Sequence, residues 1–255
     1  STTYKYDNTQ EVADLFDLKA TGHFYTRLSN PTVEALEEKI AELEGGVAAL
    51  ATSSGQAATL FSILNIASAG DHILALNNLY GGTVTLLGSR LKQFGIEVTF
   101  VSSEERDGEI EAKIKDNTKL IFGETLSNPD VRVLDIDRFA NLAHKNGIPL
   151  IVDNTFATPV LLKPIEHGAD IVTYSATKYL DGHATSVGGL IVDSGKFNWT
   201  EEKFSCLTDR DPDYHGLSYT ESFGELAYIV KARVGLMRDV GAVLSPMNAF
   251  LINLG

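Results

Sequence analysis

The sequence predicts an α/β fold built on a mostly parallel sheet, and three observations support this prediction. Short apolar runs recur between residues 47 and 193. Segments with helical periodicity separate these runs. The runs are apolar at successive positions, which indicates strands that helices cover on both faces. Strand and helix signals that alternate in this way are typical of repeated β-α-β units.

Seven apolar runs are predicted to form the strands. In chain order they are VAALAT, HILALN, EVTFV, KLIFGE, PLIVDN, DIVTY and GLIVD. Each run is short, and each is followed by polar residues or glycine. We therefore expect a seven-stranded, mostly parallel sheet with helices on both faces.

Helices are predicted before, between and after these strands. Upstream, NPTVEALEEKIAELEGG places Val33, Leu36, Ile40 and Leu43 on one stripe, with a proline near its start and two glycines at its end. The helix candidates between strands are GQAATLFSILNIAS, GTVTLLGSRLKQFG and DIDRFANLAHKNG. The pattern of SPMNAFLINLG fits a further helix.

Composition and charge argue against several classes of protein. A net charge of −13 with no Lys/Arg cluster argues against nucleic-acid binding, which needs a concentrated basic surface. No stretch approaches the roughly 18 apolar residues of a membrane span, and no signal peptide is recognisable, so no membrane partner is expected. The single cysteine, Cys206, allows no intrachain disulfide. These observations favour a cytoplasmic enzyme or binding protein.

Polar residues follow the predicted strands at the edge where open parallel sheets bind ligands. They occupy positions 53–56, 80–82, 124–128, 153–154 and 175–178. The turn SSGQAA, between a strand and a helix, offers backbone N–H groups and a helix dipole to an anion, although many such turns bind nothing. No G-x-G-x-x-G or G-x-x-x-x-G-K-[ST] motif occurs, which argues against dinucleotide and ATP sites.

Two charged residues at strand ends narrow the chemistry. Lys178 is either a solvated loop lysine or a nucleophile, and Asp153 is either a cap, a surface ion pair or the partner of a bound cation. Pyridoxal phosphate needs a lysine for its aldehyde and a carboxylate for its pyridinium nitrogen. Its phosphate needs donors of the kind that SSGQ, Ser175 and Thr177 supply. Together these requirements favour a pyridoxal-phosphate site.

The motifs that carry these residues resemble those of the γ-family, fold-type I pyridoxal-phosphate enzymes of cysteine and methionine metabolism. This family includes cystathionine synthases and lyases, methionine γ-lyases and O-acetylhomoserine sulfhydrylases. The resemblance extends from about Tyr25 to the last residue. Its motifs are YTRLSNPT, ELEGGVAAL, SSGQAA, LYGGT, ETLSNP, IVDNTFATP, YSATKY and LSPMNAFL.

The resemblance implies roles for the residues around the reacting ring. Lys178 would form the Schiff base with the cofactor and then transfer protons, and Asp153 would keep the pyridine nitrogen protonated. Tyr80 would stack on the ring and assist departure of the γ-substituent. Asn128 would lie near the phenolic oxygen of the cofactor and the substrate carboxylate. Glu124 would lie near the same edge, and a purely structural role for it stays open.

The resemblance also implies a phosphate site that two subunits share. Backbone N–H groups and hydroxyls would bind the phosphate from Gly55, Gln56, Ser175 and Thr177. Tyr25 and Arg27 would reach the phosphate of a neighbouring subunit; the alternatives are an ordinary interface aromatic for Tyr25 and a surface charge for Arg27. The resemblance therefore implies a homo-oligomer in which two subunits share their active sites, and in which such dimers assemble into a tetramer. The six histidines show no ligand spacing, so no metal site is expected.

Three sequence features select a reaction within the family. Methionine-specific lyases usually have a cysteine where this chain has Gly82. The segments DGHATSVGGLIVDSGKFNW and DPDYHGLSY are similar to those of O-acetylhomoserine sulfhydrylases. The resemblance thus implies γ-replacement on O-acetyl-L-homoserine with sulfide or a small thiol, giving homocysteine or methionine. The alternatives are a methionine or cystathionine γ-lyase, and a truncated pyridoxal-phosphate-binding module without catalysis.

Three parts are expected along the chain. Residues 1–46 would form an N-terminal segment with inter-subunit cofactor contacts, and residues 47–230 the pyridoxal-phosphate-binding domain. Residues 231–255 would lead to a C-terminal domain outside this chain. Because the family places its main arginine for the substrate carboxylate there, the chain alone is expected to turn over poorly.

Overall fold

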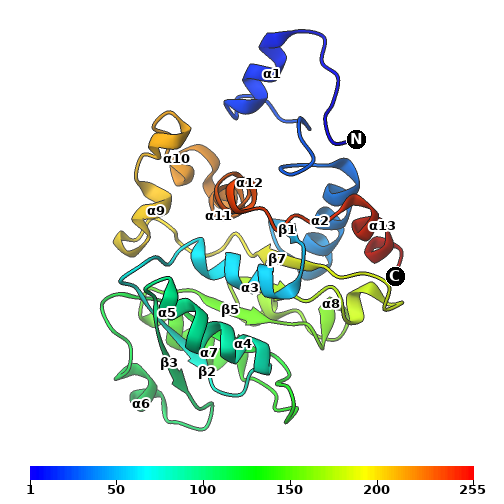
Figure 1. Ribbon diagram of the computed structural model, residues 1–255. Coiled ribbons are helices and arrows are strands. Elements are labelled where there is room, and N and C mark those ends of the chain that lie inside the picture. Colours follow the sequence, from blue (N-terminus) through cyan, green and yellow to red (C-terminus); the bar gives the residue numbers. More distant parts are fainter.

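A seven-stranded sheet forms the centre of the protein, in a computed structural model that describes residues 1–255 (Figure 1). Its strands are β1 (Ala48–Thr52), β2 (His72–Leu76), β3 (Glu97–Val101), β4 (Thr118–Glu124), β5 (Leu150–Asp153), β6 (Ile171–Tyr174) and β7 (Gly189–Asp193). Their order is β1-β7-β6-β5-β4-β2-β3. Only β7 runs antiparallel to its neighbours, β1 and β6, so the predicted mostly parallel sheet is confirmed.

Helices cover both faces of this sheet. Every residue of β2, β6 and β7 is buried, although successive side chains of a strand point to opposite faces. Strand β1 contacts α2 (Pro31–Glu44), β6 and β7 contact α3 (Gly55–Leu64), and β4 and β5 contact α7 (Ile136–Lys145). At the carboxyl ends of the strands, the loops line a pocket that is described below.

The remaining helices are short. They are α1 (Thr9–Phe16), α4 (Gly81–Thr85), α5 (Leu91–Gln93), α6 (Asp107–Glu111), α8 (Thr158–Leu161), α9 (Ser205–Thr208), α10 (Tyr219–Phe223), α11 (Ala227–Lys231), α12 (Arg238–Val240) and α13 (Pro246–Leu254). A π-helical turn, Leu86–Arg90, joins α4 to α5. The helix predicted over residues 82–95 is therefore present, with one widened turn in its middle. No helix is long and apolar enough to cross a membrane.

Helix α2 ends where its sequence signals predict. The Asn30 side chain accepts a hydrogen bond from the Thr32 N–H at 3.0 Å, and Pro31 occupies the first turn, where its missing N–H costs nothing. At the other end Gly45 adopts a left-handed conformation, with φ of 81°. These caps direct the chain from α2 straight into β1.

The buried face of α2 differs from the predicted one at its last turn. Val33, Leu36 and Ile40 are buried as expected, but Leu43 is 44% exposed, so its predicted place on the stripe is wrong. The residue buried in this turn is Glu44, four positions after Ile40. Its carboxylate accepts a hydrogen bond from the hydroxyl of Tyr174, a buried tyrosine at the end of β6. A polar residue with a distant partner has taken the core position, and the apolar pattern alone did not reveal it.

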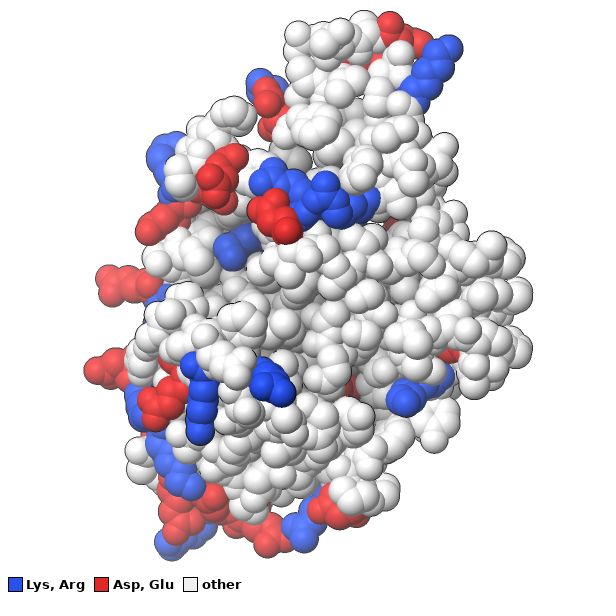
Figure 2. All heavy atoms as spheres, viewed as in Figure 1, with Lys and Arg blue, Asp and Glu red and all other residues white.

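Two surface regions of the protein differ in their side chains. In Figure 2, Lys, Arg, Asp and Glu gather toward one side of the face shown, and the opposite side, over α8 and α13, is largely uncharged. The exposed apolar side chains Val160, Leu161, Met247 and Phe250 belong to these two helices.

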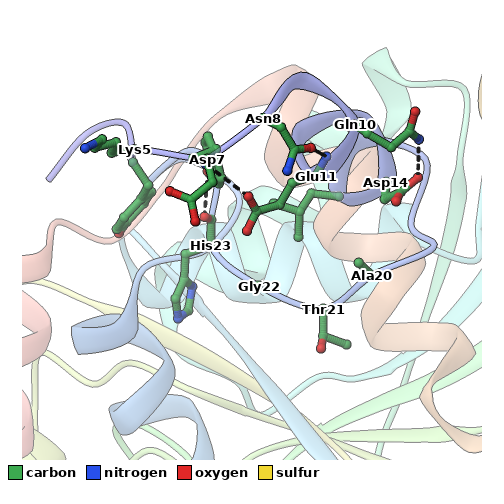
Figure 3. A pocket seen from close by; sticks show the side chains of 13 residues that line it. Lys5, Asp7, Asn8, Gln10, Glu11, Asp14, Ala20, Thr21, Gly22 and His23 are labelled. Atoms are coloured by element: carbon green, nitrogen blue, oxygen red, sulfur yellow. Dashed lines mark hydrogen bonds between the residues drawn. The ribbon is translucent and has the colours of Figure 1, made fainter.

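The N-terminal arm, residues 1–24, lies apart from the layers, with α1 at the top of Figure 1. Its largest hollow measures about 760 Å³ and is lined by side chains between residues 4 and 23 (Figure 3). The Gln10 amide donates to Asp14 at 2.8 Å, and Asn8 caps α1 through the Glu11 N–H at 2.9 Å. The Tyr6 hydroxyl also donates to the His23 carbonyl at 2.7 Å, so these bonds join residues within the arm.

Candidate active site

A pocket of about 240 Å³ lies at the carboxyl ends of the strands. Its lining comes from the segments after β1, β2, β4, β5 and β6, at the edge where the sequence placed the ligand site. The lining residues are Ser54, Gly55, Gln56, Tyr80, Glu124, Asn128, Asp153, Thr155, Phe156, Ser175, Thr177 and Lys178. All the residues proposed for the site from the sequence therefore line this one pocket, except Tyr25 and Arg27.

Lys178 lies on the connection between β6 and β7, residues 175–188. Its backbone N–H donates to the Ser175 carbonyl at 3.1 Å, in a tight turn that follows β6 directly. The Lys178 side chain is exposed, and its amine donates no hydrogen bond to another residue of the protein. Beside it, the rings of Phe156 and Tyr179 lie 5.8 Å apart. The amine is thus free to meet a ligand in the pocket.

Asp153 and Glu124 are paired across neighbouring strands. They end β5 and β4 and stand opposite each other in register. Burial raises the pKa of the Glu124 carboxyl to about 8, and the nearby Asp153 charge adds to this rise. Burial also raises the pKa of Asp153, whereas two hydrogen bonds from Thr155 lower it. Near neutral pH the raised pKa of Glu124 favours its neutral form, and the Thr155 hydrogen bonds oppose part of the effect of burial on the pKa of Asp153.

Thr155 was not predicted from the sequence. Both its N–H and its hydroxyl donate to Asp153 Oδ1, at 2.9 and 2.5 Å. The bond from the backbone N–H two residues beyond a carboxylate is an Asx-turn, a conformation that aspartate favours. The signal that would have found this residue is a hydroxyl side chain two positions after Asp153 in IVDNTFATP.

The first turn of α3 forms an anion cradle. The Ser54 hydroxyl accepts from the Ala57 N–H at 3.2 Å and so caps the helix. The N–H groups at the start of a helix have no partner within it, and the helix dipole adds positive potential there. A Cβ at Gly55 would lie 2.5 Å from the Ser175 Cβ, so only glycine lets α3 approach the end of β6 this closely.

Thr177 lines the pocket but its hydroxyl is already bonded to the protein. Its hydroxyl donates to the Gly188 carbonyl at 3.2 Å and accepts from the Gly188 N–H at 3.1 Å. These bonds join the two ends of the β6–β7 connection. The Ser175 hydroxyl has no such partner and is the freer of the two hydroxyls for a phosphate.

Tyr80 is fixed through its backbone and through a neighbouring glycine. Its N–H donates to Glu124 Oε2 at 2.7 Å, and its carbonyl accepts from the Thr83 N–H at 2.8 Å. The ring folds back over Gly82, where an added Cβ would lie 2.5 Å from Tyr80 Cε1. The side chain is 49% exposed, so one face of the ring is available to a ligand.

Tyr25 and Arg27 lie outside the pocket. The Arg27 guanidinium lies over the Tyr25 ring, 5.2 Å from its centroid, and donates to the Arg238 carbonyl. Tyr25 is 39% exposed. The two residues therefore form an exposed pair that this chain does not bring to its own pocket.

The pocket fits pyridoxal phosphate in the chemistry of its groups. It contains a free amine (Lys178), a carboxylate with one oxygen left without a donor (Asp153), an aromatic face (Tyr80) and an anion cradle at the start of α3. An aldehyde, a pyridinium nitrogen, a ring and a phosphate need these four kinds of partner.

Comparison with known proteins places this chain among enzymes of sulfur amino-acid metabolism. It is 49% identical to Sulfhydrylase FUB7 of Fusarium oxysporum and 46% identical to an O-acetyl-L-homoserine sulfhydrylase of Leptospira meyeri; each match covers 100% of this chain and 59% of the relative. The chain thus spans about three fifths of the length of these relatives.

A solved structure shows the same fold with a modified lysine. The crystal structure, from Campylobacter jejuni, contains N′-pyridoxyl-lysine-5′-monophosphate. It matches with a TM-score of 0.95 and 37% identity, over 99% of this chain and 63% of that one. The family model described as Cys/Met metabolism PLP-dependent enzyme matches residues 1–255. The chain therefore belongs to the pyridoxal-phosphate-dependent enzymes of cysteine and methionine metabolism.

Proposed function

We propose that the protein replaces the acetoxy group of O-acetyl-L-homoserine with sulfide or a small thiol. Acetate leaves from Cγ and the sulfur bonds there, which gives homocysteine from sulfide or methionine from methanethiol. The observation that carries the proposal is the single pocket that joins Lys178, Asp153 and the α3 anion cradle. The relatives named as sulfhydrylases support this reaction. The proposal concerns the whole protein, because the chain spans 59% of those relatives.

Pyridoxal phosphate, when bound, supplies an electron sink for the substrate Cα–H bond. Lys178 would hold the cofactor aldehyde, and its amine would move protons at the substrate Cα and Cβ. Asp153 keeps a proton on the ring nitrogen through its negative charge. Asp153 ends β5, and Lys178 lies in the turn that follows the neighbouring strand β6.

The other lining residues bind and orient. The start of α3 and the Ser175 hydroxyl hold the phosphate, and Thr177 shapes the turn through its bonds to Gly188. The exposed face of Tyr80 covers the ring, and its hydroxyl assists the leaving acetate. Asn128 binds the phenolic oxygen of the cofactor and the substrate carboxylate. A neutral Glu124 adds no second charge beside Asp153.

We further propose that two copies of the protein complete each active site. Tyr25 and Arg27 are exposed and adjacent, so they are able to reach the phosphate in a neighbouring subunit of a dimer or tetramer. The functional parts are residues 1–46, 47–230 and 231–255, and a further C-terminal domain supplies the arginine for the substrate carboxylate. A single free cysteine fits a cytoplasmic location.

The test is an assay of the full-length protein with O-acetyl-L-homoserine. Homocysteine formation that requires sulfide is the expected result. Formation of 2-oxobutyrate and ammonia without any thiol indicates a γ-lyase and contradicts γ-replacement. Binding of pyridoxal phosphate without either product indicates a module that binds the cofactor and processes nothing.

A further inference from the structure

The hydroxyl of Thr155 links two parts of the pocket that lie on different strands. It donates to Asp153 Oδ1 at 2.5 Å and accepts from the Ser175 N–H at 2.8 Å. A threonine hydroxyl carries one hydrogen, and Ser175 supplies the hydrogen of the second bond. The donors and acceptors of these two hydrogen bonds are therefore fixed: the Ser175 N–H donates to the Thr155 oxygen, and the Thr155 hydroxyl donates to the Asp153 carboxylate.

This chain of bonds determines which carboxylate oxygen remains available. Asp153 Oδ1 accepts both from the Thr155 hydroxyl and from the Thr155 N–H, at 2.5 and 2.9 Å. The other oxygen, Oδ2, receives no hydrogen bond from the protein, and Asp153 lines the pocket. Donors to a carboxylate stabilise its charged form, which opposes the effect of burial on Asp153.

The same hydroxyl also fixes the start of the anion cradle. Ser175 directly follows β6, and its Cβ lies against the place where a Cβ of Gly55 would be. By accepting the Ser175 N–H, Thr155 ties the end of β6 to the segment after β5. The ring end and the phosphate end of the pocket thus share one hydrogen-bonded side chain.

We propose that Thr155 is a positioning residue for this site: its hydroxyl orients the Asp153 carboxylate with Oδ2 free for the cofactor nitrogen and couples it to Ser175 beside the phosphate. The inference rests on the proposed function, because it assigns Thr155 a role in binding pyridoxal phosphate. Thr155 acts through Asp153 and Ser175 and takes no proton itself.

The experiment compares three variants of the full-length protein. Thr155→Val removes the hydroxyl at nearly constant shape, and Thr155→Ser keeps it. The matched control is Thr173→Val on β6, in register with Asp153, because the Thr173 hydroxyl is buried without a partner. Equilibrium binding of pyridoxal phosphate and the pH dependence of the cofactor absorbance are measured for each, and thermal unfolding shows that each is folded.

The expected result follows from the loss of one hydrogen bond to a charged group. Thr155→Val weakens pyridoxal-phosphate binding about tenfold to a hundredfold and moves the pH profile of the bound cofactor. Thr155→Ser restores both to within about threefold of the wild type. Thr173→Val matches the wild type. If Thr155→Val does not fold, Thr155→Ala replaces it with the same expectation.

Two outcomes overturn the inference. If Thr155→Val binds pyridoxal phosphate as tightly as the wild type does, the Thr155 hydroxyl does not position the carboxylate. Equal losses in Thr155→Val and Thr155→Ser show that the methyl group, and not the hydroxyl, matters. In both cases the wild type still binds the cofactor, so the proposed function stands. A wild-type protein that binds no pyridoxal phosphate contradicts the proposed function, and the inference fails with it.

Discussion

The pocket at the strand ends is smaller than the hollow of the N-terminal arm, but the two regions also differ in the hydrogen bonds that hold their side chains. The hollow measures about 760 Å³ and the pocket about 240 Å³. The side chains of the hollow bond only within the N-terminal part of the chain, as Gln10 does with Asp14 and the Tyr6 hydroxyl with the His23 carbonyl. In the pocket, Glu124 bonds to the backbone of Tyr80, and Thr155 to that of Ser175. Bonds that join the ends of separate strands, and not volume, distinguish the site.

The difference arises from what holds each region in place. The residues of the pocket stand at the ends of strands whose relative positions are fixed by the sheet, and Glu124 and Asp153 are held in register. The arm has one short helix and no strand in the sheet. Substitutions in the pocket are therefore expected to change function, and those in the hollow to change little.

The largest effect is expected from Lys178→Ala. Without the amine, the protein forms no Schiff base, and loss of proton transfer lowers kcat by about 10²–10⁴-fold. Absorbance spectra before and after borohydride reduction measure the first effect, and the sulfhydrylase assay measures the second. A variant that keeps a band sensitive to borohydride would show that another amine holds the cofactor.

A smaller loss is expected from Asp153→Asn, which keeps the shape of the side chain but removes its charge. The ring nitrogen then loses the partner that keeps it protonated, and kcat falls by about a hundredfold or more. Steady-state kinetics at saturating pyridoxal phosphate measures this fall. An unchanged kcat would show that Asp153 has no role in the reaction. It would also weaken the contrast between the pocket and the hollow of the N-terminal arm.

Gly82→Ala tests whether the ring of Tyr80 must fold over a glycine. The added Cβ would lie 2.5 Å from Tyr80 Cε1 and displace the ring, with an expected loss of about tenfold to a hundredfold in kcat/KM. Gly81→Ala is the matched control, since a Cβ there meets nothing within 4 Å. Equal kinetics in the two variants would show that the position of the ring is unimportant.

Glu124→Gln tests the raised pKa of this carboxyl through stability. In the folded protein that pKa is about 8, against an ordinary value of 4.5, so the folded state holds the proton more tightly. The resulting stability is complete below about pH 4.5 and is lost as the pH rises through about 8.

The stability of the wild type should therefore fall relative to Glu124→Gln across this range. At about 1.4 kcal/mol for each pKa unit and about 2–4 °C for each kcal/mol, the difference in Tm should change by roughly 10–20 °C between about pH 4.5 and 8. Thermal unfolding at several pH values, without added cofactor, measures it. A constant difference would mean that Glu124 titrates normally.

The smallest effect is expected from Asp14→Asn in the hollow of the arm. Asn keeps an acceptor for the Gln10 amide, so the free energy of unfolding should stay within about 0.5 kcal/mol. Affinity for pyridoxal phosphate should not change. Denaturant unfolding and cofactor titration test both expectations, and a large loss of affinity would assign the hollow a role in the site.

The sequence was sufficient to predict the fold and most of the pocket, because both depend on local patterns. Apolar runs show where strands lie, and the polar residues directly after them, such as Asp153 and Ser175, share one edge. Contacts between distant residues were not predictable. The bond from the Tyr80 N–H to Glu124 spans 44 positions and depends on how β2 and β4 are aligned.

The error at Leu43 has the same origin. A helical stripe read from apolar residues assumes that every core position is apolar. Glu44 occupies the core because Tyr174, at the end of β6, donates a hydrogen bond to it. The partner of a buried carboxylate is set by the tertiary fold, so no window of the sequence around α2 contains it.

The antiparallel pairing of β6 and β7 has a consequence for how this protein tolerates change. A connection between two parallel strands must carry the chain from the carboxyl end of one strand back to the amino end of the next, usually through a helix. Between β6 and β7 the chain has no such return to make, and residues 175–188 stay at the carboxyl edge with Lys178 among them. Insertions within this segment are thus able to alter the mouth of the pocket while the helical layers keep their lengths and their packing.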